Sequence, residues 1–186
     1  MYPFFVAAGV VALGEIGDKT QLLALFLALQ FRRPWPIVLG ILAATLLNHA
    51  AAAAAGAWLA AQFDPLLARR AIGISFLVIA LWTLRADHLD KASADARTGW
   101  GIFAVTALAF FLAEIGDKTQ VATFMLAARF DNLPAVIAGT TAGMLIADVP
   151  AVLLAQRIAD RVSMPLMQRL AAIAFALLGL WTLFAS

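Results

Sequence analysis

The sequence contains no cysteine and few charged residues. The absence of cysteine excludes disulfide bridges, thiolate metal ligands and cysteine nucleophiles. Only 13% of the 186 residues are charged and 64% are hydrophobic, whereas a soluble domain carries about a quarter charged residues. The net charge of +2 gives no argument for a nucleic-acid partner. We therefore expect a membrane protein whose main partner is the lipid bilayer.

Apolar stretches fill most of the chain, and turn formers and charges separate them. A helix that crosses a bilayer needs about 20 residues, and six stretches reach about this length. The longest polar segment is Arg85–Gly99, and no basic region precedes the first stretch, so a cleaved signal peptide is not expected. The sequence predicts an all-α integral membrane protein with six transmembrane helices. The six stretches are Phe4–Phe31, Pro36–Phe63, Leu66–Leu84, Trp100–Phe130, Leu133–Ile158 and Met167–Phe184.

The second half of the chain repeats the first at an offset of 99 positions. The motif Glu15–Gln21 recurs unchanged as Glu114–Gln120. Each copy holds three stretches, and because three is odd, the second copy enters the membrane from the opposite side. The expected organisation is a three-helix repeat at 1–85, a cytoplasmic linker at 86–99 and an inverted repeat at 100–186. Inverted repeats are a recurring plan of secondary transporters.

Basic residues lie unevenly on the two sides of the expected membrane protein. The odd-numbered loops hold eight of them and the other side holds three. Because basic residues mark the cytoplasmic side, both termini are predicted to lie outside. The eight are Arg32, Arg33, Arg85, Lys91, Arg97, Arg157, Arg161 and Arg169, and the three are Arg69, Arg70 and Arg129.

Both motifs place charges in the middle of an apolar stretch. Each charge costs about 2.5–3.5 kcal/mol on insertion scales if it faces lipid. On a continuous helix, Glu15 and Asp18 share a face with Lys19 nearby, although Gly17 permits a local break. One lysine then neutralises one of the two carboxylates in each half, and two negative charges remain. We interpret Lys19 and Lys118 as charge-balancing residues, and the remaining charge matches one divalent cation or two protons.

Each motif also gathers oxygen atoms from two carboxylates, a hydroxyl and an amide. Such a set suits hard divalent ions such as Ca²⁺ and Mn²⁺. The alternative is a purely structural network of lysines and carboxylates, but such a network would be expected to balance its own charge. The predicted metal ligands are Glu15, Asp18, Thr20, Gln21, Glu114, Asp117, Thr119 and Gln120.

The second and fifth stretches hold weaker candidates. Asp148 lies beside Pro150, and its counterpart at the 99-residue offset is His49, which follows Asn48. An intramembrane histidine could carry a proton or bind a metal, and it could equally do no more than bond two helices. We treat Asp148, His49 and Asn48 as candidates for proton coupling or auxiliary ligation.

Two copies of the pattern E-x-G-D-[KR]-[ST] in a six-helix membrane protein resemble the family of Golgi-type cation–proton exchangers and bacterial manganese exporters. The copies read Glu15–Thr20 and Glu114–Thr119, and the resemblance covers essentially the whole chain. It implies export of Mn²⁺ and/or Ca²⁺ from the cytosol in exchange for protons, with the acids of both motifs forming the ion site. It also implies a transporter of the bacterial inner membrane, neither an enzyme nor the holder of a cofactor.

Three other functions stay open. An exporter of Cd²⁺ or of an amino acid would share the six-helix plan, but no arginine lies deep within a stretch to hold an amino-acid carboxylate. An intramembrane hydrolase would be expected to show a zinc motif such as H-E-x-x-H, which is missing. A scaffold protein would have no use for buried charges. Both Mn²⁺ and Ca²⁺ suit the ligand set, and both a monomer and a homodimer are compatible with the sequence.

Overall fold

The computed structural model describes residues 1–62, 64–83, 99–155 and 164–184. In this part of the chain every regular element is a helix and no strand occurs, so the predicted all-α class is confirmed there. The expected linker at 86–99 lies outside the described residues, apart from Gly99. The helices are α1 (Tyr2–Glu15), α2 (Lys19–Phe31), α3 (Pro34–Ala60), α4 (Pro65–Thr83), α5 (Gly99–Glu114), α6 (Lys118–Arg129), α7 (Leu133–Leu153) and α9 (Met164–Phe184).

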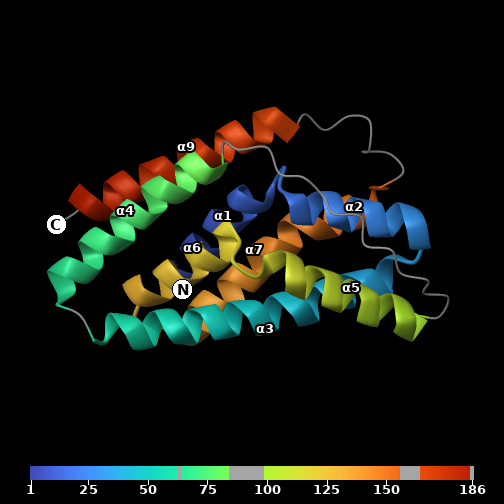
Figure 1. The fold of residues 1–186 in the computed structure, drawn as a ribbon, viewed down its shortest axis with the longest axis horizontal. Helices are drawn as coiled ribbons and strands as arrows, with labels where there is room; N and C mark the ends of the chain where they lie inside the picture. Colours follow the sequence, from blue (N-terminus) through green and yellow to red (C-terminus); the bar gives the residue numbers. More distant parts are fainter. Residues whose placement is uncertain (63, 84–98, 156–163, 185–186) are drawn as a thin grey trace.

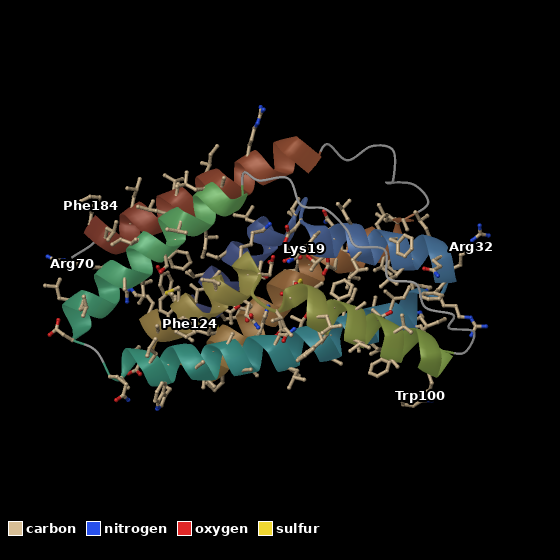
Figure 2. The ribbon with its side chains drawn as sticks, viewed as in Figure 1. Lys19, Arg32, Arg70, Trp100, Phe124 and Phe184 are labelled. Carbon is tan, nitrogen blue, oxygen red and sulfur yellow. The ribbon has the colours of Figure 1, made fainter. Side chains whose placement is uncertain are left out.

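Several of these helices suit a membrane. α3 and α7 are long and apolar enough to cross one, and the bent pair of α5 and α6 makes a third span if it counts as one. α1 and α2 are shorter apolar helices. Large apolar side chains cover much of the outer surface, and Trp58, for example, is 67% exposed. The charged side chains of Arg32 and Arg70 project at opposite ends of the bundle (Figure 2). An outer surface covered by large apolar side chains suits lipid rather than water.

The first and fourth apolar stretches are not continuous helices, because each breaks within its motif. α1 ends at Glu15 and α2 begins at Lys19, and α5 ends at Glu114 and α6 begins at Lys118. Between them, Gly17 and Gly116 have φ angles of 84° and 75°, a conformation that side-chain-bearing residues rarely adopt. α5 and α6 are bent by 70° relative to each other. The break that Gly17 permits is thus present in both copies of the motif.

Each broken pair packs on the long helix of the other half. α1 lies along α7, and α3 lies along α5 and α6 (Figure 1). Equivalent residues make the two contacts, since Gly40 of α3 meets the backbone of Phe103 and Gly139 of α7 meets the backbone of Phe4. The 99-residue offset relates Gly40 to Gly139 and Phe4 to Phe103. The repeat seen in the sequence is therefore also a repeat in the packing.

The helices in these two contacts run in the same direction. Gly143 meets Ala8 one turn beyond the first contact between α7 and α1. Further along α3, the side chain of Asn48 donates to the carbonyl of Phe111 on α5. Residue numbers rise together in both contacts, so α1 is parallel to α7 and α3 is parallel to α5. The helices of the third apolar stretch in each half are α4 and α9, and they pack against each other (Figure 1).

A side chain at Gly139 should weaken the packing of α1 against α7. A Cβ atom there would lie 2.4 Å from the carbonyl oxygen of Phe4 and 2.9 Å from the Cβ of Ala7. Overpacking of this kind costs about 1–3 kcal/mol, so Gly139→Ala should lower the melting temperature of the purified protein by several degrees. At Gly9 no atom lies within 4 Å of the added Cβ, so Gly9→Ala should leave the melting temperature unchanged or raise it. Equal shifts in both variants would contradict the close approach.

Candidate ion-binding site

The helix breaks bring the acids of both motifs into one buried region. Glu15 and Glu114 are the last residues of α1 and α5, and Asp18 and Asp117 immediately precede α2 and α6. All four side chains are buried. The charges of the other three and of Asp148 act on Glu15. Five carboxyl groups from both halves of the chain therefore interact within this region.

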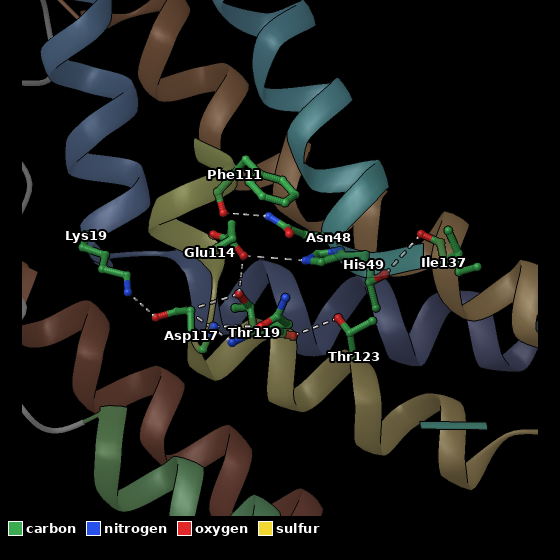
Figure 3. Close-up of polar contacts among 12 residues, drawn as sticks. Lys19, Asn48, His49, Phe111, Glu114, Asp117, Thr119, Thr123 and Ile137 are labelled. Atoms are coloured by element: carbon green, nitrogen blue, oxygen red, sulfur yellow. Dashed lines mark hydrogen bonds and ion pairs between the residues drawn. The ribbon is translucent and has the colours of Figure 1, made fainter. Parts of the chain in front are cut away.

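Each motif lysine pairs with the aspartate of the other motif. Lys19 Nζ lies 2.9 Å from Asp117 Oδ1 (Figure 3), and Lys118 Nζ donates to Asp18 Oδ1. The prediction that each lysine neutralises a carboxylate of its own half is therefore wrong. That prediction assumed helical spacing between Glu15 and Lys19. No helix connects these residues, because the chain turns at Gly17 between them. The two ion pairs join the halves reciprocally.

Within the described ranges no lysine forms an ion pair with either motif glutamate, although the charge of Lys118 interacts with that of Glu15. Among the described residues, neither carboxylate oxygen of Glu15 has a hydrogen-bond partner. Glu114 Oε2 accepts a hydrogen bond from Thr119 Oγ1 at 3.1 Å and lies 3.8 Å from His49 Nε2 (Figure 3). A buried carboxylate without a partner is costly. A cation or a proton at either glutamate would therefore stabilise the site.

The neutral groups of the motifs have different environments. Gln21 Oε1 accepts from the N–H of Gly17 at 2.9 Å, and Gln120 Oε1 accepts from the N–H of Gly116 at 2.8 Å. Each of these amide oxygens thus bonds to the backbone of its own helix break. The hydroxyl of Thr20 is buried and has no hydrogen-bond partner within the described ranges.

Asp148 and His49 occupy equivalent places in the two halves. Both are fully buried, on α7 and α3. No described residue hydrogen-bonds to either oxygen of Asp148, and its charge interacts with those of Glu15 and Glu114. The first half therefore presents a histidine to the motif glutamates where the second half presents an acid.

Backbone carbonyls at the site gave no signal in the sequence. Asn48 Nδ2 donates to the carbonyl of Phe111 at 3.1 Å (Figure 3), and Gln21 Nε2 donates to that of Ala147 at 3.1 Å. Thr106 was also missed, and its buried hydroxyl on α5 has no partner in the described part of the chain. The 99-residue offset pairs Ala147 with Asn48, Phe111 with Ala12 and Thr106 with Ala7, so the repeat does not mark these positions as polar.

The acidic and histidine side chains are not gathered around one point. Within the described ranges, no group of three or more of them is arranged to hold a metal ion. Two of the four motif acids are paired with lysines instead. Ion binding by the eight predicted ligands stays a prediction.

The two ion pairs should differ in their contribution to stability. The side chains of Lys118 and Asp18 are 3% and 0% exposed, whereas Lys19 is 25% exposed. Removing one partner of a buried pair costs on the order of 3–5 kcal/mol, so Lys118→Gln should lower the melting temperature more than Lys19→Gln. Adding Asp18→Asn to Lys118→Gln should restore part of the loss. An equal loss for the two lysine variants, measured in the same detergent, would contradict this difference.

Comparison with known proteins supports the resemblance. The chain matches the family described as the divalent cation/proton antiporter GDT1 twice, over residues 3–91 and 102–186. A Vibrio cholerae protein named "Putative manganese exporter" is 46% identical over 181 residues, which cover 96% of this chain and 89% of that protein. A GDT1-like protein of Synechocystis is 31% identical over 206 residues, with 95% of each chain covered. No solved structure matches the chain.

The family identity accounts for the apolar helices and for the buried charges together. A transporter of divalent cations and protons is not an enzyme, and it works as a multi-pass protein in a membrane. The match extends over both halves of the chain, each of which carries one motif. The chain belongs to the GDT1 family of divalent cation/proton antiporters.

Proposed function

We propose that this protein exports Mn²⁺ from the cytosol in exchange for protons, at a site built from the acids of both motifs. The observation that carries the proposal is that the four motif acids are buried and only two lysines form ion pairs with them, so two negative charges remain in excess. A divalent cation balances these two negative charges, and so do two protons. The name of the Vibrio relative supports manganese. Ca²⁺ is the second candidate, because it takes the same oxygen ligands.

The exchange follows from the cost of leaving these charges unbalanced. When the ion departs, two carboxylates would stand uncompensated in a medium of low dielectric constant, where burial favours the protonated form. Protons therefore take the place of the ion on the return step. The simplest ratio is two protons for each divalent ion. Asp148, which is buried near the same acids, can carry a further proton.

We further propose six spans arranged as two inverted repeats, at residues 1–85 and 100–186. In an inverted arrangement, the first span of each half runs parallel to the second span of the other half. The parallel packing of α1 with α7 and of α3 with α5 supports this plan. The distribution of basic residues supports a cytoplasmic linker and two outside termini. The beginning of α1 and the end of α9 lie toward the same end of the bundle (Figure 1). We assign this membrane to the bacterial inner membrane, and the bacterial origin of the Vibrio relative supports this assignment.

Neutralising the motif acids should separate transport from stability. Glu15→Gln and Glu114→Gln should reduce Mn²⁺ flux in proteoliposomes to background and leave the melting temperature unchanged or higher, because neither glutamate forms an ion pair with a lysine in the described part of the chain. Asp18→Asn and Asp117→Asn should abolish flux and also lower the melting temperature, because each removes the ion-pair partner of a lysine. Asp64→Asn is the matched control, since Asp64 lies at an exposed turn before α4. Export at the wild-type rate in all four motif variants would overturn the assignment.

Proton exchange should make Mn²⁺ movement depend on the direction of a pH gradient. Vesicles loaded with Mn²⁺ should release it faster into an acidic medium, because protons enter as the ion leaves, and a pH dye inside should report acidification. Reversing the gradient should slow the release. Ca²⁺ and Cd²⁺ are tested under the same gradient, and the double variant Glu15→Gln/Glu114→Gln serves as the inactive control. Mn²⁺ release that ignores the gradient at every pH would remove the exchange but keep the ion site.

A further inference from the structure

The two motifs have the same sequence but different surroundings. At the first break, Gly17 is buried, and so is the ion pair between Lys118 and Asp18, whose side chains are 3% and 0% exposed. At the second break, Gly116 is exposed, and Lys19, which reaches this break from the other half, is 25% exposed. One break is therefore enclosed and the other lies toward the protein surface. Identical residues do not by themselves cause this difference.

The side chain of Gln21 joins the enclosed break to the opposite half. Its Oε1 accepts from the N–H of Gly17 at 2.9 Å, and its Nε2 donates to the carbonyl of Ala147 on α7 at 3.1 Å. Ala147 directly precedes Asp148. A single amide thus holds the first motif against the helix that carries the additional buried acid.

At the second, more exposed break, the described part of the chain shows no equivalent bond from the glutamine to the long helix of the other half. The 99-residue offset places Gln120, Gly116 and Asn48 where the first break has Gln21, Gly17 and Ala147. Gln120 Oε1 accepts from Gly116 at 2.8 Å, but its amide nitrogen donates to no residue of α3 in the described part of the chain. On α3, the side chain of Asn48 is bonded to Phe111 of α5.

We propose that Gln21 and Gln120 are positioning residues that alternate during transport, an inference that rests on the transport function proposed above. In the present conformation the side chain of Gln21 is bonded to α7 and the first break is enclosed. In the oppositely facing conformation Gln120 donates to the carbonyl of Asn48, and Gln21 has released Ala147. Because the two motifs are identical, each break can adopt the state that the other shows here. The glutamines thus control which motif is enclosed and do not serve as primary ligands of the ion.

The variants Gln21→Met and Gln120→Met form a matched pair that tests this alternation. Both lose the same cap on the glycine of their own break, so each variant is examined at the break that it does not alter. Gln62→Met is the control, since Gln62 donates to the carbonyl of Trp58 at the exposed end of α3. The measurements are amide hydrogen exchange of the peptides that contain Gly17 and Gly116, Mn²⁺ affinity, and Mn²⁺ flux.

We expect each variant to lower hydrogen exchange at the opposite break. Losing one connection disfavours the conformation that contains it and shifts the population toward the other. Gln21→Met should therefore protect the Gly116 peptide, and Gln120→Met should protect the Gly17 peptide. Flux should fall about tenfold in both variants, as for residues that orient a metal site, while Mn²⁺ affinity and the Gln62→Met control stay at the wild-type level.

Unchanged exchange at the opposite break would overturn the alternation, and so would wild-type flux in both variants. Equal losses of Mn²⁺ affinity without a change in exchange would show that the glutamines are ligands instead. If the methionine variants do not insert, Gln21→Leu and Gln120→Leu give the same comparison. Protection at the opposite breaks in a protein that carries no Mn²⁺ would remove the proposed substrate and still support the alternation.

Discussion

Each of the two lysine–aspartate pairs formed by the motifs joins residues of different halves, and the rest of the site depends on this arrangement. Burying two charges is favourable only when they meet in good geometry, so the two broken segments must lie with their breaks side by side. Positive φ angles at Gly17 and Gly116 place the aspartates there. Gly40 and Gly139 allow α3 and α7 to pack directly against the backbone of α5 and α1. With the lysines engaged by the aspartates, the glutamates are the acids that remain for a cation.

Much of the fold could be predicted because it follows from local rules. Apolar runs predicted the helices, the gapless repeat predicted two related halves, and the glycine within the motif was compatible with a break. The cost of lipid-exposed charge predicted that the motif acids are buried. Asp148 followed from the same rule, since one ionisable group in an apolar stretch must face inward. In the described part of the chain, the all-helical class and the burial of these acids are confirmed.

The pairing and the difference between the halves could not be predicted in this way. Helical spacing favours Glu15 as the partner of Lys19, but the left-handed turn at Gly17 removes that spacing and leaves a partner distant in sequence, Asp117. The carbonyl of Ala147 accepts the amide of Gln21 although nothing in an alanine marks its backbone as an acceptor. The unequal exposure of two identical motifs is a property of the conformation, so no local pattern can encode it.

The reciprocal pairing also determines how many chains the site requires. In the inverted arrangement that we propose, a chain with one copy of the motif could neutralise its aspartate in this manner only by meeting a second chain packed in the opposite direction. That encounter would depend on the protein concentration in the membrane and on the insertion of both chains in opposite senses. Here both copies belong to one polypeptide, so their ratio is always one to one. The effective concentration of each lysine at the other aspartate is then set by the connecting chain. Covalent linkage thus converts an assembly equilibrium into a step of folding.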